Sequence, residues 1–278
     1  MLAISLAFIA CLSWGTSGFL AGMKSKVMPV LTLLVFSSIA GSGMLFIIIG
    51  VRGLSLPKDP NLFYAVLGGA AGIGGLYCLY YGLVIGAISI VVPISALCVM
   101  LPVIAGLIRG EVLYLIQGLG MVTAIGGCVL VSLEKTTKQE KHLAAGIVPA
   151  FGAALGFGVF YVVMDLAGSV DPLWAAMVSR SSFFLFLLPA VLYKRPTLKV
   201  NAIHLPAVFA IGILDATAAF SYTTATTKGM LSLVSVVSSL YPVVSVILAA
   251  LILKERLRRS QLFGVVLTIL GIALISAR

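Results

Sequence analysis

Long apolar runs separated by short polar connectors are the dominant pattern along this chain. Each run has about 20 residues, the length that an α-helix needs to cross the hydrocarbon core of a bilayer. Continuous runs of this length, rather than short alternating ones, favour helices over a β-barrel. The breaks at polar, Gly and Pro clusters predict ten membrane helices, at residues 3–23, 30–51, 62–83, 88–109, 113–133, 145–166, 173–193, 203–223, 230–252 and 260–277.

Composition supports a multi-pass protein that has the lipid bilayer as its surroundings. Of the 278 residues, 61% are hydrophobic and 9% are charged, whereas charged residues make up about 25% of soluble domains. The basic residues behind the net charge of +10 lie in short connectors rather than on one face or tail, which argues against nucleic-acid binding. The first apolar run begins almost at Met1 without a basic leader, so we interpret it as a membrane helix rather than a cleavable signal.

The two halves of the chain repeat each other in sequence. The long charged connector EKTTKQEKH at 134–142 predicts three units: residues 1–133, a linker at 134–143, and residues 144–278. At a spacing of 143 or 144 residues, identical pairs include Gly15 and Gly158, Pro29 and Pro172, Glu111 and Glu255, Gln117 and Gln261, Gly120 and Gly264, and Gly127 and Gly271. Because each half has an odd number of predicted helices, the second half enters the membrane inverted. Such inverted repeats are characteristic of secondary transporters with a substrate site near the midplane.

Motifs at the ends of helices four and nine stand out from the apolar background. Helix four ends with a Pro…Gly-Glu pattern from Pro102 to Glu111, helix nine carries SLYPVVSVILAALILKERL at 239–257, and QLFGVVLTILGIALI follows at 261–275. Together with Trp14-Gly15, these motifs resemble the drug/metabolite transporter superfamily, EamA type, over nearly the whole chain. The resemblance implies a carrier of small polar or amphipathic metabolites whose cavity is lined chiefly by helices 1, 3, 4, 6, 8 and 9.

The two copies of the proline motif are unequal in length. Nine residues separate Pro102 from Glu111, but thirteen separate Pro242 from Glu255, so we expect the two halves to gate unequally. Lys254, Glu255 and Arg256 predict the exit of helix nine into water, with Glu111 as the counterpart on the other membrane face. Both glutamates are interpreted as markers of helix ends with possible contacts to a gate.

Charge and resemblance predict opposite orientations. Lys and Arg concentrate in the connectors between helices 1 and 2, 5 and 6, 7 and 8, and 9 and 10, so the positive-inside rule places both termini outside the cell. Carriers of the resembled type usually have both termini in the cytoplasm. The side that the termini face therefore stays open at this point.

Three charged residues lie inside predicted membrane helices, where a central charge costs about 2.5–3.5 kcal/mol on insertion scales. Asp215 is the deepest carboxylate and is predicted to bind a substrate ammonium or take up a proton, unless it only joins two helices. Arg180 is predicted to hold a substrate carboxylate or phosphate through its planar fork, the alternative being an ion pair with Asp165 or Asp171. Asp165 is the third and weakest candidate.

Aromatic residues inside the predicted helices are the next candidates for substrate contact. They are Trp14, Tyr77, Tyr80, Tyr81, Phe157, Tyr161 and Tyr222. Tyr77, Tyr80 and Tyr81 have the spacing of one broad helical face, and Tyr222 lies two turns from Asp215 on the same face. An aromatic cavity suits amino acids, aromatic solutes or a quaternary ammonium. Packing between helices is the structural alternative.

Proline and glycine positions predict how the helices bend and pack. Pro93, Pro102 and Pro242 interrupt helices four and nine, which makes them hinge candidates, with a fixed kink as the alternative. The stretch GGAAGIGG at 68–75 predicts a close approach of helix three to a neighbour.

Enzymes and channels fit the sequence less well than a carrier. GTSG at 15–18 resembles the serine motif of intramembrane rhomboid proteases, but His142 and His204 lie in or beside connectors, away from such a serine. The four cysteines lie in apolar runs without CxxC spacing, so we expect packing roles, no metal and no cofactor. A channel would show symmetric rings of polar residues.

The sequence therefore predicts an all-α, multi-pass protein of a bacterial inner membrane, monomeric or weakly dimeric. We expect alternating-access export of amino acids or related small metabolites, with Asp215 as the candidate for proton coupling. The alternative is an importer of a cationic solute such as choline, held by the tyrosines, Trp14 and Asp215.

Overall fold

The computed structural model of the chain describes residues 1–25, 27–85, 91, 94–132, 146–196, 200–254 and 259–276. These residues form helices and loops without any strand. In the first half the helices are α1 (Leu2–Lys24), α2 (Val30–Val51), η1 (Pro60–Leu62), α3 (Phe63–Ile85), η2 (Ala96–Val99), α5 (Met100–Ile108) and α6 (Leu115–Ser132). In the second half they are α7 (Ile147–Gly168), α8 (Pro172–Lys194), η4 (Ala202–His204), α9 (Leu205–Thr226), α10 (Leu231–Ser239), α11 (Tyr241–Ile252) and α12 (Arg259–Ser276).

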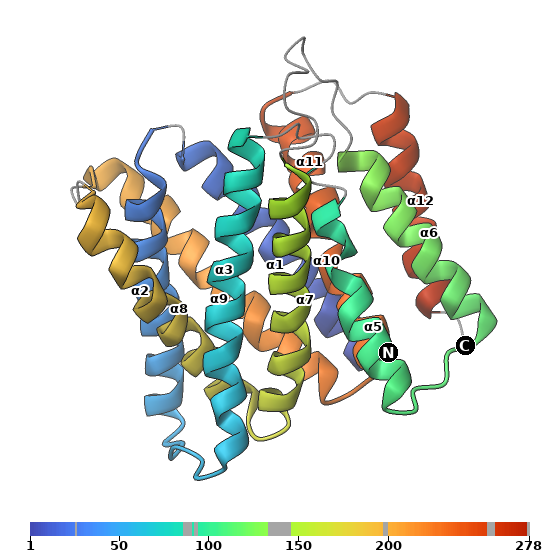
Figure 1. Cartoon of the computed structure of the whole chain (residues 1–278), viewed down its shortest axis with the longest axis horizontal. Helices are drawn as coiled ribbons and strands as arrows, with labels where there is room; N and C mark the ends of the chain where they lie inside the picture. Colours follow the sequence, from blue (N-terminus) through green and yellow to red (C-terminus); the bar gives the residue numbers. More distant parts are fainter. Residues whose placement is uncertain are drawn as a thin grey trace.

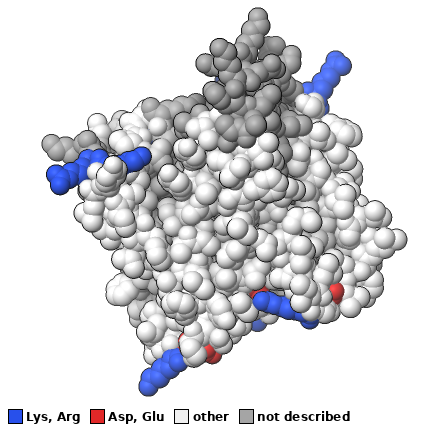
Figure 2. Space-filling model, viewed as in Figure 1, with Lys and Arg blue, Asp and Glu red and all other residues white. Residues whose placement is uncertain are grey.

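Most of the described helices are long and apolar enough to cross a membrane. Eight spans meet this criterion in the described part of the chain, and two shorter apolar helices, Ala96–Ile108 and Leu115–Val131, stand in the places of predicted helices four and five. In the view of Figure 2, charged side chains gather at the two ends of the molecule and leave a wide uncharged band between them. An all-helical membrane protein is confirmed, whereas the count of ten spans stays a prediction.

At one end of the helical bundle, which we call the terminal face, α1 begins and α5 and α12 end (Figure 1). The other end is the opposite face.

Helices of one half pack mainly against helices of the other half. The helix α1 packs along α9, its counterpart α7 packs along α3, and α6 packs along α12. A Cβ at Gly120 would lie 2.8 Å from the Gly271 carbonyl oxygen, and one at Gly127 would lie 2.6 Å from that of Gly264. Because Gly120 is equivalent to Gly264 and Gly127 to Gly271, these contacts exchange when the halves exchange. This is the packing of two inverted copies.

The glycine-rich stretch at 68–75 brings α3 close to two helices of the second half. A Cβ at Gly69 would lie 2.6 Å from the carbonyl oxygen of Ser179 on α8. On α7, a Cβ at Gly156 would lie 2.7 Å from Cα of Gly75. Side chains larger than hydrogen do not fit at these points, so the predicted close approach is confirmed.

The two proline-containing helices are both interrupted. Leu240 separates α10 from α11, and Pro242 is the second residue of α11. An N–H group in the first turn of a helix has no partner within the helix, so proline loses no hydrogen bond there. In the first half, the 3₁₀ turn η2 precedes α5, of which Pro102 is the third residue. Pro93 lies outside the described residues. Interruption of helix nine next to Pro242 and of helix four before Pro102 is confirmed, and motion at these points stays a prediction.

Equivalent glycines pack each interrupted helix against the other half. A Cβ at Gly15 on α1 would lie 2.8 Å from the Tyr241 carbonyl oxygen, and Ser245 Oγ donates to the Gly15 carbonyl over 2.7 Å. On α7, a Cβ at Gly158 would lie 2.7 Å from the Cys98 carbonyl oxygen in η2. The repeated Gly15 and Gly158 therefore hold the interrupted helices at the interface of the two halves.

Candidate functional site

An arginine and an aspartate form an ion pair near the middle of the bundle. Arg180 on α8 donates from Nη2 to Oδ2 of Asp215 on α9 over 2.8 Å. Arg180 is 9% exposed, and its guanidinium carbon lies 5.2 Å from the centroid of the Phe183 ring. Its Nε is buried and has no hydrogen-bond partner among the described residues. The pair thus keeps one strong donor free beside a partly exposed carboxylate.

The partner of Arg180 differs from both sequence alternatives, so the expectation of a pair with Asp165 or Asp171 is wrong. Arg180 lies eight residues beyond Pro172, about 12 Å along α8, and reaches sideways to α9 instead. Asp171 accepts the backbone N–H of Trp174 over 2.8 Å and caps α8. Asp165 pairs with Arg109. Asp165 and Asp171 therefore have partners near the helix ends at which they lie, and neither pairs with Arg180.

Four aromatic rings form a cluster between α1, α7 and α9. Trp14 lies 5.9 Å from Tyr161, 6.0 Å from Tyr222 and 6.1 Å from Phe160, measured between ring centroids. The Tyr222 hydroxyl donates to the Tyr161 carbonyl over 2.9 Å and lies 3.0 Å from Ser235 Oγ. Tyr222 and Tyr161 are buried. The structure therefore brings three of the predicted aromatic residues together beneath the terminal face, and adds Phe160.

The remaining aromatic candidates lie apart from this cluster. On α3, Tyr80 is 41% exposed. Tyr77 and Tyr81 stack on each other at 6.2 Å, and both are exposed. Phe157 lies against Gly75, where a Cβ would be 2.9 Å from its ring. The predicted tyrosine face on α3 is thus largely exposed and separate from the aromatic cluster.

The end of α5 is a tight turn that projects two charged side chains. Gly110 has φ +88°, a left-handed conformation that glycine adopts without strain. The N–H of Glu111 donates to the Gly106 carbonyl and that of Gly110 to the Leu107 carbonyl, both over 3.0 Å. These two bonds define a Schellman motif. The Pro…Gly-Glu pattern of the sequence is therefore a helix end, as expected.

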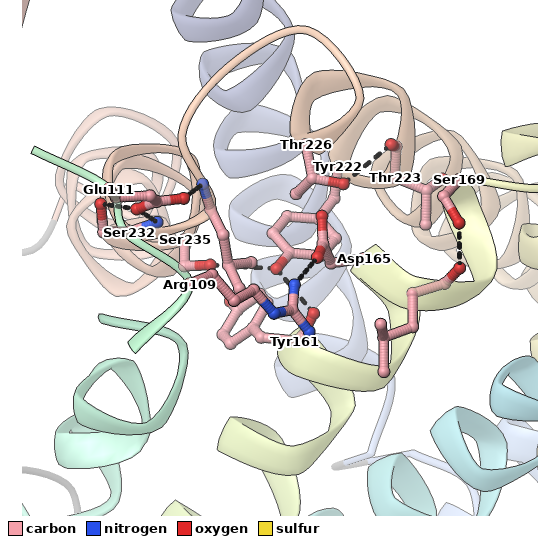
Figure 3. Close-up of polar contacts among 12 residues, drawn as sticks. Arg109, Glu111, Tyr161, Asp165, Ser169, Tyr222, Thr223, Thr226, Ser232 and Ser235 are labelled. Atoms are coloured by element: carbon pink, nitrogen blue, oxygen red, sulfur yellow. Dashed lines mark hydrogen bonds and ion pairs between the residues drawn. The ribbon is translucent and has the colours of Figure 1, made fainter. Parts of the chain in front are cut away.

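Both side chains of this turn reach the second half of the chain (Figure 3). Glu111 accepts the backbone N–H of Leu231 through Oε1, and the N–H of Ser232 through Oε2 over 3.1 Å. The Ser232 hydroxyl also donates to Oε2. Arg109 forms an ion pair with Asp165, three residues before the end of α7. At the terminal face, one turn of the first half is thus bonded to both α7 and α10.

Sequence reasoning missed several members of this network. Arg109 and Glu111 follow the last apolar residues of helix four, which is the ordinary place for charges that enter water. Ser232 and Ser235 lie in an apolar run in which serine carries little information by itself. The useful signal was the identity of Glu111 and Glu255 across the repeat, because a repeated acid beside a helix end suggests a repeated contact.

Clusters of metal-binding side chains are not found among the described residues. Cys11, Cys98 and Cys128 are buried, Cys78 is partly buried, and none of the four is in a disulfide in the described part of the chain. Their surroundings fit the packing role that was predicted for them.

Comparisons with known proteins agree on the family and the fold. The model of the EamA-like transporter family matches residues 1–133 and again residues 144–277. An uncharacterised protein of Methanocaldococcus jannaschii is 28% identical over 132 residues, which are 47% of this chain and 96% of that protein. A solved crystal structure superposes with a TM-score of 0.83 at 19% identity, and the match covers 99% of this chain and 96% of the other. The last match concerns the fold alone.

Proposed function

Because the chain belongs to the EamA-like transporter family, and so is a multi-pass transporter of the drug/metabolite type, we propose that it carries amino acids or related small metabolites. In this proposal the substrate binds at Arg180 and Asp215, and the two halves expose it alternately to the two sides of a bacterial inner membrane. Export is the proposed direction, and Asp215 is the proposed proton acceptor.

The unpartnered Nε of the buried Arg180 carries the proposal. A buried donor without a partner is costly, because its hydration is not replaced. A substrate carboxylate placed along the edge of the guanidinium accepts from two nitrogens at once, while Asp215 accepts from the substrate ammonium. Each charge of the existing 2.8 Å pair then has an opposite charge on the substrate. A zwitterion therefore matches this pair better than a solute with one charge.

A cationic solute such as choline is the alternative that the aromatic residues bring to mind. A cation held in an aromatic cage needs the faces of the rings. Here the centroids of Tyr161 and Tyr222 lie only 4.8 Å apart, so these two rings pack against each other. This packing favours the zwitterion over the quaternary ammonium.

Thermal-shift and counterflow measurements with the purified protein test the substrate class. We expect amino acids to raise the melting temperature of the wild type and to show counterflow in proteoliposomes. Arg180→Lys, which retains the charge but loses the fork, should abolish both responses. Arg195→Lys at the exposed end of the same helix is the matched control and should retain them. A response to choline with none to amino acids would contradict the proposal.

Proton coupling has its own test at Asp215. We expect Asp215→Asn to abolish uptake driven by a pH gradient, because an amide does not take up a proton in the working range. Transport by Asp215→Asn with the rate and pH dependence of the wild type would remove the proton from the proposal and leave the substrate class untouched.

A further inference from the structure

We propose that Arg109, Glu111, Asp165 and Ser232 form the gate that closes the terminal face, and that this gate must open in every transport cycle. This inference rests on the proposed alternating access, because the gate consists of the contacts that would break and form again in each cycle. Its polar contacts join residues 109–111 of the first half to α7 and α10 of the second half. In the proposed cycle, contacts that join the halves at the terminal face must break when the halves separate at that face.

Glu111 supplies a cap that α10 lacks in its own sequence. The residue before α10 is Met230, whose side chain makes no capping hydrogen bond. Helix N-termini have free N–H groups and a partial positive charge, and they are stabilised by a negatively charged acceptor. The carboxylate of Glu111 accepts from the N–H groups of both Leu231 and Ser232. The start of α10 is therefore completed only while the two halves are together.

Arg109 satisfies an acid in an unfavourable position. Asp165 is three residues before the last residue of α7, where the partial negative charge of a helix end repels a carboxylate. The Arg109 guanidinium compensates both charges in an ion pair in which the side chain of Asp165 is 15% exposed. Opening the gate therefore requires water to replace Arg109 at Asp165 and Glu111 at α10.

The two contacts depend on one small structural unit. Arg109 and Glu111 flank Gly110, so a displacement of the end of α5 breaks both together. Glu111 folds back over Gly106, where a Cβ would lie 2.7 Å from the carboxylate carbon. A methyl group at position 106 must push this carboxylate away. The gate can thus be broken without changing any of its charged residues.

The layer beneath the gate is buried. Ser235 and Tyr222 are both 0% exposed, and the Tyr222 hydroxyl is bonded to Ser235 and to the Tyr161 carbonyl. Figure 3 shows these residues beside the Arg109–Asp165 pair. Ser235 is therefore a position that a water-soluble reagent reaches from the terminal face only after the gate opens.

Cross-linking tests whether the gate must open. In Glu111→Cys/Ser232→Cys, a short bifunctional thiol reagent should lower counterflow at least about tenfold, and cleavage of the link by a reductant should restore it. Each single cysteine variant treated in the same way is the control. The linked protein should still show the thermal shift with substrate, because the central pair is unchanged. Unchanged counterflow in the linked protein would overturn the gate.

Labelling tests the gate without any substrate, so it stands even if the proposed substrate class fails. A membrane-impermeant thiol reagent is applied to Ser235→Cys from the terminal side, in a chain whose native cysteines are replaced. Adding Glu111→Ala or Gly106→Ala should speed labelling by about tenfold, the effect of losing about one partly buried, charge-assisted hydrogen bond. Glu111→Asp, which retains the carboxylate, should give a labelling rate closer to that of the parent.

Asp171→Ala is the matched control for this measurement. Asp171 also caps a helix at the terminal face, but its partner Trp174 is in the same half. The variant should lower stability without speeding the labelling of position 235. Equal acceleration by Asp171→Ala and Glu111→Ala would show that loss of any cap loosens the face, and would overturn the assignment of the gate.

Discussion

Two arginine–aspartate pairs lie at different depths of this protein and join different parts of it. Arg109 and Asp165 lie at the terminal face and join the first half to the second, with side chains 40% and 15% exposed. Arg180 and Asp215 lie near the middle, and both belong to the second half, with side chains 11% and 28% exposed. Two pairs of the same chemistry therefore differ in whether a movement between the halves would separate their partners.

The difference between the pairs separates binding from gating. In the proposed cycle, a pair within one half stays together while the halves move, so Arg180 and Asp215 would remain available to a substrate from either side. A pair between the halves at the terminal face would exist only while that face is closed. Its strength sets the population of the closed terminal face, because a contact made in one state shifts the equilibrium toward that state.

Removing the arginine of each pair gives the largest expected contrast. Arg180→Ala removes a largely buried arginine, whose side chain is 11% exposed, together with its ion pair, and breaking a buried pair costs up to about 3–5 kcal/mol. Arg109→Ala breaks a pair that is partly exposed, which typically costs about 0–1 kcal/mol. Thermal unfolding of both variants in one detergent measures the contrast. Equal losses of stability would mean that depth does not distinguish the pairs.

Exchanging the charges of the gate pair is expected to have the next largest effect. Arg109→Asp alone places two carboxylates together and should speed labelling of a cysteine at position 235 by about tenfold. The double variant Arg109→Asp/Asp165→Arg restores opposite charges and should return the labelling rate toward that of the parent. Failure of the double variant to slow labelling would argue against a gate held by this pair.

The helices and the repeat followed from the sequence because they depend on composition and spacing. Apolar length predicted the spans, and identical residues at a constant spacing predicted the repeat, whose two copies meet at Gly120, Gly127, Gly264 and Gly271 in the structure. The partner of Arg180 could not be predicted in the same way. Helix spacing fixes which residues share a face of one helix, but the rotation of α8 against α9 is set by packing with further helices. Both acids that the sequence offered as partners, Asp165 and Asp171, were therefore wrong.

Tyr222 lies between the two pairs and allows a smaller test of the same distinction. Its hydroxyl has two partners, Tyr161 and Ser235, and all three residues belong to the second half. Tyr222→Phe removes one buried hydrogen-bonding group and should lower the free energy of unfolding by about 1 kcal/mol. We expect the rate of labelling from the terminal face to stay near that of the parent. Here the labelled position is Val236→Cys, which is also buried, because Ser235 is itself a partner of the Tyr222 hydroxyl. Faster labelling would mean that contacts inside one half also hold the gate.

The two copies of the helix-ending turn extend the comparison to the backbone. Gly110 has φ +88°, and its counterpart at a spacing of 144 residues, Lys254, has φ +56°. The sequence showed the unequal lengths from proline to glutamate but not this shared conformation, since lysine rarely adopts it. Glu255 lies outside the described residues, whereas Leu251, Ile252 and Leu253 before it are exposed. Only the first copy is thus described as bonded across the halves.

Lys254→Gly is the mildest change that this comparison suggests. A residue with a Cβ costs about 1–2 kcal/mol in the left-handed conformation, and glycine removes this strain. Glycine also makes the unfolded chain more flexible, which offsets part of the gain. We therefore expect Lys254→Gly to raise the free energy of unfolding by about 0.5–1 kcal/mol, and Gly110→Lys to lower it by a similar amount. Thermal unfolding measures the stability, and the rate of labelling at position 235 measures the gate. Because the turn at Gly110 positions Arg109 and Glu111, Gly110→Lys should also speed labelling, whereas Lys254→Gly should leave it unchanged. The two variants should therefore change stability in opposite directions, and only Gly110→Lys should change the labelling rate. This is the result expected if the two turns are equivalent in conformation but only the first closes the terminal face.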